Sequence, residues 1–274
     1  MRISETLEAM AVVEIAFMPI TILLSAVYSL LGMIIGLMLG VIAFALLSMT
    51  AGKRILKSHR ARIADPTKHS ELYDVLEEVA KKADVRMPSL ALVPTGVPNS
   101  FTVSIGGNTV VLALTYGALR TLNREEIKAL MGHEIGHVIN GNVLPRTVAS
   151  FLSGILMSIP MKAGKTKGFF FKLFSKPAEM ILKLAFNQDD EFAADYHALH
   201  LVGKNQLISA LQKIDRAIEL RPLKDITPSL APLYFVNPFR GRGWAALFSL
   251  HPPTEERIRY IKEAWGETNE GSGS

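Results

Sequence analysis

Hydrophobic residues are concentrated at the start of the chain. After Glu8, and as far as Met49, the sequence is almost wholly apolar, and its one charged residue is Glu14. A single helix of about 40 residues would be about 60 Å long, twice the thickness of a hydrocarbon core of about 30 Å. Two spans joined near residues 29–32 fit better, because a cleaved signal peptide has a much shorter apolar region. The pattern therefore predicts a transmembrane helical hairpin over residues 1–50.

The second predicted span carries small residues at regular spacing. Gly32, Gly36 and Gly40 recur every four positions, so they share one face of a helix. Such a small-xxx-small pattern suits close contact between two membrane helices. We expect the two spans to pack against each other along these glycines.

A basic segment follows the hairpin and indicates its orientation. Five lysine and arginine residues lie between residues 53 and 62, whereas the connection between the two spans carries no charge. Positively charged flanks favour the cytoplasmic side of a membrane. We therefore predict a basic linker over residues 51–69, with both ends of the hairpin and the following domain in the cytoplasm.

Beyond the linker the pattern becomes that of a folded domain, over residues 70–270. Helical spacing covers Ser70–Asp84 and Arg124–Asn140, the second with Asn123 as N-cap and Glu126 placed for a capping box. Short strand-like runs lie between the two helices, at Ser89–Val93, Phe101–Ile105 and Thr109–Thr115, with a glycine-rich hairpin turn at residues 106–108. The predicted class is α+β, mainly helical, with a small antiparallel sheet.

Two further apolar stretches form an insertion over residues 143–187. Val148–Met161 has about 14 residues, too few for a comfortable span, and Gly168–Phe186 is interrupted by lysines and a proline. The loop between them is basic, which disfavours placing it outside the cell. We interpret the two stretches as an interfacial or partly inserted hairpin, with two true spans as the alternative.

Composition limits the kinds of metal site and of binding partner that the chain can have. The chain has no cysteine, so it has no disulfides, and a metal site must use histidine and carboxylate ligands. Its net charge is +5, but the basic residues lie beside apolar runs rather than on an aromatic-rich face. That arrangement favours a membrane partner and excludes nucleic acid as the expected one. The tail, residues 271–274, reads GSGS and is interpreted as a linker or tag remnant.

The second predicted helix contains the motif H-E-x-x-H at His133, Glu134 and His137. Positions i and i+4 share one face of a helix, so both imidazoles can reach one tetrahedral ion. Glu134 lies beside that face and can touch a water on the metal. Zinc lowers the pKa of such a water toward about 7, and the carboxylate can then accept its proton.

A third ligand is required, and the spacing after His137 provides no further histidine of the H-x-x-G-x-x-H kind. Glu191 and Asp195 are four residues apart on a predicted helix and therefore share a face. One carboxylate can bind the metal while the other accepts the spare N–H of a histidine ligand. An ordinary acidic helix start remains the alternative.

These residues together resemble the HtpX-type membrane metalloproteases, which are relatives of the CAAX prenyl proteases. The resemblance runs over most of the chain. It includes residues 132–137 and 140–142, the stretch at residues 98–101, where Ser100 stands for the family's alanine, and residues 251–254 with Arg257. Gly136 stands for the family's usual serine, with no consequence expected for the metal.

The resemblance implies the roles of the site residues. His133, His137 and Glu191 are the expected zinc ligands, with one Zn²⁺ per chain, and Glu134 is the expected general base. Asp195 is the expected partner of a zinc-bound histidine. His251 could stabilise the oxyanion or merely precede the last helix, Thr254–Trp265, and Arg257 could hold a carboxylate or be a surface charge.

The implied fold is zincin-like, in which an extended substrate pairs with the edge strand above the metal helix. We expect Val110–Thr115 to be that edge. The expected substrate-binding residues are Asn99, Val110, Leu112 and Leu114.

The expected function is zinc-dependent endoproteolysis at the cytoplasmic face of the cell membrane, by a multi-pass protein. The expected substrates are proteins, especially damaged or misfolded membrane proteins, as the resemblance implies. Prenyl-protein proteolysis is the alternative among enzymes. A catalytically silent membrane scaffold and a metal sensor are the alternatives outside that class, and neither requires Glu134.

Overall fold

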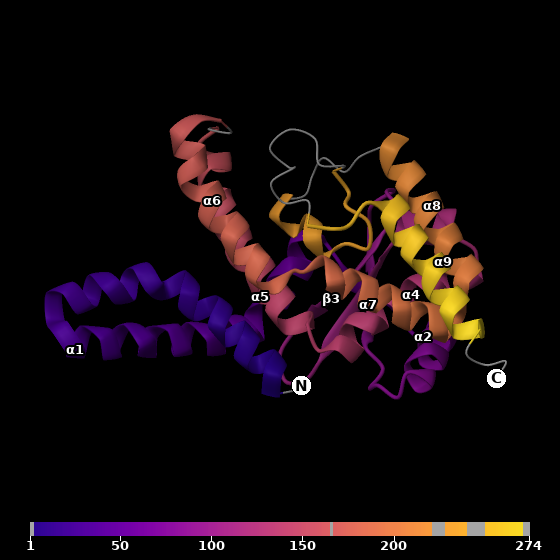
Figure 1. Cartoon of the computed structure of the whole chain (residues 1–274), viewed down its shortest axis with the longest axis horizontal. Coiled ribbons are helices and arrows are strands. Elements are labelled where there is room, and N and C mark those ends of the chain that lie inside the picture. The colour runs from indigo at the N-terminus through magenta and orange to yellow at the C-terminus, as the bar shows by residue number, and fades with distance from the viewer. Residues whose placement is uncertain (1–2, 165–166, 221–227, 240–249, 271–274) are drawn as a thin grey trace.

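The computed structural model describes residues 3–164, 167–220, 228–239 and 250–270. The predicted tag remnant, residues 271–274, lies outside the described residues. The strands all lie before residue 116, and the described elements after them are helical (Figure 1). In order they are α1 (Ile3–Ser58), β1 (Arg62–Ile63), α2 (Ser70–Lys82), β2 (Ser89–Val93), β3 (Ser100–Ser104), β4 (Val110–Thr115), α3 (Tyr116–Thr121), α4 (Arg124–Asn140), α5 (Val143–Lys162), α6 (Gly168–Ala185), α7 (Gln188–Val202), α8 (Lys204–Leu220), the 3₁₀ segment η1 (Pro228–Leu233) and α9 (Thr254–Glu270).

The apolar helix α1 reverses direction within its length. Ser29 has φ 52° and ψ −132°, which is not helical, and the two halves of α1 lie side by side (Figure 1). A Cβ built on Gly32 would lie 1.9 Å from the backbone oxygen of Leu24, and one on Gly36 would lie 2.6 Å from the hydroxyl of Thr21. The halves can approach this closely only because these positions lack side chains.

The basic segment after the apolar region is not a free linker. Residues 51–58 continue α1, and Arg62–Ile63 form β1, which pairs with β2. The prediction of a linker over residues 51–69 is therefore wrong for these residues. The lysines and arginines of this segment lie on the last turns of a helix that leads directly into the sheet.

The four strands form one sheet in the order β1-β2-β4-β3. β1 and β2 are antiparallel, β2 and β4 are parallel, and β3 and β4 are antiparallel. The sheet is mixed, so the prediction of an antiparallel sheet is wrong. The predicted hairpin between β3 and β4 is confirmed, and its turn contains Gly106, Gly107 and Asn108, all with positive φ.

The predicted edge strand is also wrong. β4 pairs with β2 on one side and with β3 on the other, so its backbone cannot pair with a substrate. The edge strand beside α4 is β3. Its outer side is partly covered, because Ser100 O accepts from Phe235 N at 3.0 Å and Ser104 N donates to the Thr147 hydroxyl at 3.0 Å.

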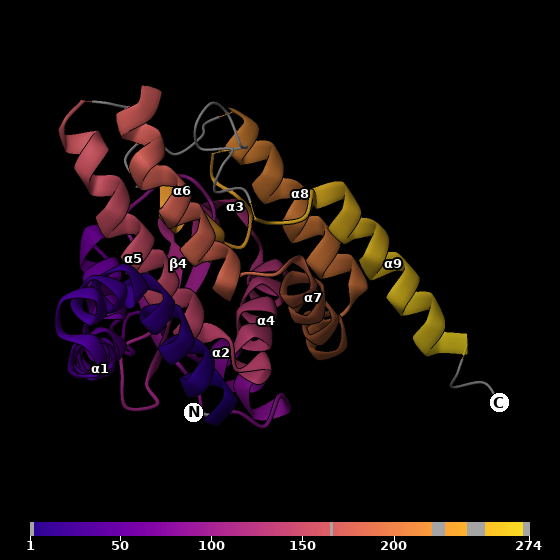
Figure 2. The same cartoon turned by 60° about the vertical axis from the view of Figure 1, so that its left-hand side comes forward.

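Alternate residues of the sheet face two different sets of helices. Leu90, Leu92, Leu112 and Leu114 belong to a core shared with α2, α4, α7 and α8. The intervening residues of the same strands, with Phe101 and Val103 of β3, pack with residues of α1, α5 and α6. The sheet therefore separates a helical domain from the apolar helices. α8 and α9 lie side by side away from α1 (Figures 1 and 2).

Both stretches of the predicted insertion are helical. α5 packs against α1 and α6, and the hydroxyl of Ser153 donates to the backbone oxygen of Ala178 at 2.8 Å. The start of α5 is joined to that of α1, because Leu144 N donates to the carboxylate of Glu5 at 3.0 Å. In the described part of the chain, α1 and α5 are the helices long and apolar enough to cross a bilayer.

Helices α4 and α7 also pack closely against each other. A Cβ built on Gly136 would lie 2.8 Å from both Cα and O of Ala194 on α7. The serine that the HtpX-type pattern has at this position would press against that backbone. Gly132, one turn earlier, faces the same helix with more room, because the nearest atom is a methyl group of Val202 at 3.1 Å.

We expect Gly136→Ser to lower the free energy of unfolding by about 1–3 kcal/mol, as overpacking does, because α7 must move away from α4. Gly132→Ser is the matched control. It makes the same change of helix propensity, but the Val202 side chain can turn aside. Thermal melting of the purified protein in detergent measures both. Equal losses in the two variants would contradict the close packing at Gly136.

Candidate metal centre

The helix that carries the two histidines begins and ends at the predicted residues. Asn123 and Glu126 form the predicted capping box, with both backbone–side-chain distances at 2.9 Å. Gly141 ends the helix in the left-handed conformation. These signals fix α4 in place, so that His133 and His137 face the same direction one turn apart.

The ligand atoms of His133, His137 and Glu191 converge. The two Nε2 atoms are 3.2 Å apart, and each lies 3.5 Å from one carboxylate oxygen of Glu191. The three side chains are buried, and all their donor atoms lie within 4.8 Å of one another. Two imidazole nitrogens and a carboxylate in this arrangement are the ligand set that zinc uses in catalytic sites.

Two features of the cluster fit a cation. Glu191 Oε2 is buried without a hydrogen-bond partner among the described residues. The Nδ1 atom of His133 lies 2.8 Å from a carboxylate oxygen of Asp195, which places the proton there and leaves a lone pair on Nε2. That lone pair and the orphaned oxygen point to the same place, where a divalent ion would satisfy both.

Asp195 is itself held by Arg257. The guanidinium donates to both carboxylate oxygens, through Nε at 2.7 Å and Nη2 at 2.6 Å. Arg257 is 1% exposed and also donates to the backbone oxygen of Phe235. The surface-charge interpretation of Arg257 is therefore wrong, and it holds a carboxylate of the site. Burial would raise the pKa of Asp195, but Arg257 outweighs it and keeps that pKa below its usual value.

Glu134 is fixed from the neighbouring strand. The hydroxyl of Ser100 donates to Oε1 at 2.6 Å, and that of Thr102 donates to Oε2 at 2.7 Å. Because alternate residues of a strand share a face, both hydroxyls of β3 point toward α4. Burial raises the pKa of Glu134 and outweighs the opposing effects of the neighbouring His133 and of these hydroxyls. A raised pKa suits a carboxylate that must accept a proton.

Arg146, from the first turns of α5, completes the charged cluster. Its Nη2 donates to Glu191 Oε1 at 2.7 Å and to the backbone oxygen of Pro232 at 2.9 Å. Its Nη1 lies 2.6 Å from Nδ1 and 2.8 Å from Nε2 of His137. Burial and then the charge of Arg146 hold the pKa of His137 well below its usual value, so the ring is neutral and able to bind a metal.

His251 lies at the edge of the same cluster. Its Nδ1 is 3.1 Å from Glu191 Oε2, and its side chain is 5% exposed. Burial opposes ionisation of Glu191, but the charges at His251 and Arg146 outweigh it and hold the pKa of Glu191 well below its usual value. A pocket of about 230 Å³ is lined by His251 and Arg257, next to the ligands. The structure thus brings His251 to the centre, although the sequence leaves its role open.

The predicted substrate-binding residues lie elsewhere. Leu112 and Leu114 are fully buried in the core. The amide of Asn99 is engaged within the fold, donating to Val236 O at 2.7 Å and accepting from Val236 N at 3.2 Å. Asn99 therefore holds the segment after η1 against β3. The prediction that these side chains contact a substrate is not supported by their positions.

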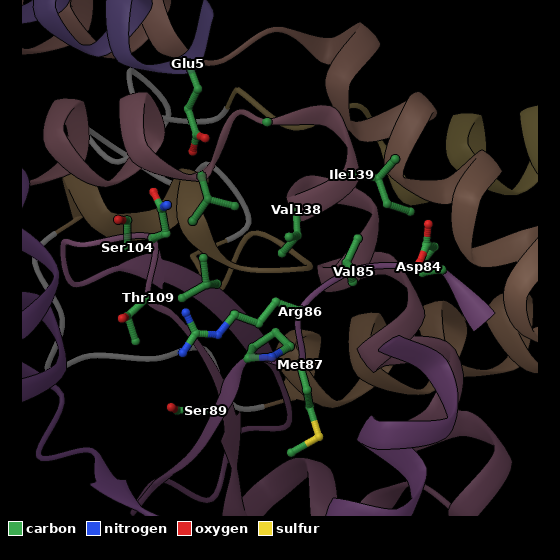
Figure 3. Close-up of a pocket in the computed structure, with 16 residues that line it drawn as sticks. Glu5, Asp84, Val85, Arg86, Met87, Ser89, Ser104, Thr109, Val138 and Ile139 are labelled. Atoms are coloured by element: carbon green, nitrogen blue, oxygen red, sulfur yellow. The ribbon is translucent and has the colours of Figure 1, made fainter. Parts of the chain in front are cut away.

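A separate pocket of about 540 Å³ lies near the start of α1 and the end of α4 (Figure 3). Its lining includes Glu5, Arg86 and Ile139, and of the predicted substrate-binding residues only Val110. None of the four residues of the H-E-x-x-H motif and its third ligand lines it. This pocket is therefore not part of the candidate metal centre.

Sequence reasoning missed three residues of the centre. Ser100 and Thr102 were not assigned a role, although their i, i+2 spacing in a strand places two hydroxyls on one face. Arg146 was overlooked because it lies beside apolar residues, where a single arginine is typical of a membrane flank. The signal is a single charge in a run, residues 143–161, that is otherwise uncharged.

Comparison with known proteins shows the family of this chain. The model of peptidase family M48 matches residues 66–265. A protein named Protease HtpX homolog from Pyrococcus abyssi is 35% identical over 226 residues, covering 76% of this chain and 78% of the relative. Proteins of the same name from Methanocaldococcus jannaschii and Syntrophobacter fumaroxidans are 33% and 32% identical, covering 86% and 88% of this chain and 88% and 97% of those relatives. The matched region contains the histidine and carboxylate residues of α4 and α7, and the chain belongs to peptidase family M48.

Proposed function

We propose that this member of the M48 family is a membrane-anchored zinc endopeptidase. The observation that carries the proposal is the convergence of His133, His137 and Glu191 around one position, with Glu134 buried beside it. Zinc is favoured because two imidazoles and one carboxylate leave a fourth position open, as in catalytic zinc sites.

The residues of the chain divide the work of peptide hydrolysis among them. When bound, a zinc ion would supply a Lewis acid and lower the pKa of a water at the fourth position. Glu134 would accept the proton of that water through an oxygen that Ser100 or Thr102 already orients. Asp195 and Arg257 keep His133 in the tautomer that presents Nε2. His251 lies where it could donate to an oxyanion, which is the role we propose for it.

The proposed location is the cytoplasmic face of the cell membrane. The basic residues at the end of α1 support this orientation, because positively charged flanks favour the cytoplasm. The large exposed hydrophobic residues of α1 support insertion of that helix into a bilayer. The proposed substrates are membrane proteins, chiefly damaged or misfolded ones. An intact Glu134 with two hydrogen-bond donors supports an enzyme over a silent scaffold or a metal sensor.

We expect Glu134→Gln to keep the metal and lose turnover by at least about 10²–10³, the usual contribution of a general base. The amide retains the shape and can still accept from one hydroxyl of β3, so the fold should persist. Metal analysis and cleavage of casein, on wild type and variant in detergent, measure the two quantities. A metal-loaded variant with wild-type turnover would end the assignment of Glu134 as base.

We expect Glu191→Ala to abolish tight metal binding, because two imidazoles alone hold the ion poorly. Asp195→Ala should weaken metal binding less, by about 10–100-fold, because it removes only the support of His133. Titration against a chelator measures both affinities. The opposite order of effects would mean that the two carboxylates have exchanged roles.

We expect a cysteine at Lys167, between α5 and α6, to react only with reagents that reach the cytoplasm. The metal ligands on α4 and α7 must lie on one side of the bilayer, and a basic loop favours the cytoplasm. Ser29→Cys, at the turn of α1, is the control and should be labelled from outside intact cells. The native chain has no cysteine, so each label has one target. Labelling of Lys167→Cys from outside would show that α5 and α6 both span the membrane.

A further inference from the structure

Arg146 is a buried arginine that touches four elements at once. It projects from α5 and is 3% exposed. Its guanidinium carbon lies 4.6 Å from the centroid of the Phe186 ring, at the end of α6. Its Nη2 donates to Pro232 O of η1 and to Glu191 of α7. A side chain held on this many sides is fixed in place, which is the condition for orienting another group.

The two terminal nitrogens of the guanidinium differ in the hydrogen bonds that they can keep when a metal is bound. Nη1 lies within 2.8 Å of both ring nitrogens of His137, but a neutral imidazole has only one acceptor nitrogen, so Nη1 can donate to only one of them. An ion on Nε2 of His137 would displace it. Nη2 has no such conflict, because its partners are Glu191 Oε1 and the oxygen of Pro232. The anchored end is therefore Nη2.

The two oxygens of Glu191 also differ. Oε1 accepts from Arg146, whereas Oε2 is buried without a hydrogen bond in the described part of the structure, although His251 Nδ1 lies 3.1 Å from it. A carboxylate free at both oxygens can bind a metal through either or both. A carboxylate with one oxygen held by a guanidinium presents the other alone.

The geometry points to Arg146 as a positioning residue of the metal centre, which holds Glu191 by Oε1 and so leaves Oε2 as the oxygen available to the ion. This inference rests on the proposed zinc site and adds a residue to it. It also links the metal centre to α5 and α6, because the same guanidinium stacks on Phe186. A residue that orients a ligand in this way typically accounts for 10–100-fold of metal affinity.

Two substitutions distinguish a role of Arg146 in orienting Glu191 from a role in balancing its charge. Arg146→Lys keeps the positive charge but loses the planar fork that reaches two acceptors at once. Arg146→Met removes the charge and keeps much of the apolar stem. We expect both variants to bind Zn²⁺ about 10–100-fold more weakly than wild type in chelator titration. Lys162→Met, an exposed residue at the far end of α5, is the control and should bind as wild type does.

Cobalt substitution gives a second readout that does not depend on activity. The visible spectrum of Co²⁺ follows the number and geometry of its ligands. With Oε1 released, Glu191 can also bind through both oxygens. The cobalt band of Arg146→Lys and Arg146→Met should therefore change in position and intensity, while that of Lys162→Met should match wild type.

Two results would overturn the inference. If Arg146→Lys keeps both the affinity and the spectrum of wild type, Arg146 only balances the charge of Glu191. If Arg146→Met binds metal more tightly than wild type, the guanidinium opposes the ion rather than orienting its ligand. Arg146→Lys retains the buried charge and decides the question even if Arg146→Met fails to fold. A wild-type protein that binds no metal would instead refute the proposed function.

Discussion

The structure depends on the compensation of two buried carboxylates, Glu191 and Asp195. A carboxylate removed from water is strongly unfavourable unless cations and hydrogen-bond donors surround it. Arg257 compensates Asp195 from α9, and Arg146 compensates Glu191 from α5. The two arginines are 111 residues apart in the sequence, Arg146 near its middle and Arg257 in the last helix. The two carboxylates of α7 therefore hold α5 and α9 against the same helix, although these helices are far apart in the sequence.

Those charges require α4 and α7 to lie close together. His133 must reach Asp195, and the imidazoles must reach Glu191, across the contact between the two helices. Gly136 removes the side chain that would separate the backbones, opposite Ala194. The metal centre is therefore built on rigid elements rather than on loops, which favours precise placement of ligands. The hydroxyls of β3 extend the same arrangement to Glu134 from the sheet.

Local signals allowed helices such as α2 and α4, and the placing of two histidines on one face of α4, to be predicted. The capping box at Asn123, the i, i+4 histidines and the glycine turn at residues 106–108 act over a few residues each, so a sequence pattern can reveal them. The order of the strands depends instead on the pairing of β2 with β4, which passes over β3, and no local pattern encodes it. Arg146 and the two hydroxyls were missed for the same reason, because their partners lie far away in the sequence. The sequence alone leaves Arg257 either as a surface charge or as the partner of a carboxylate. Its contact with Asp195 at 2.6 Å shows the second.

The alternation of β3 has a consequence for how this strand can change. Ser100 and Thr102 face the metal helix, while Phe101 and Val103 face α1, α5 and α6. Deleting or inserting one residue would exchange the two sets. Aromatic and branched side chains would then face Glu134, and the hydroxyls would lie among the apolar helices. Changes in the length of this strand are therefore tolerable only two residues at a time. The two faces of this short strand thus have different partners. A shift of one residue would disturb the contacts with Glu134 and the packing against α1, α5 and α6 at the same time.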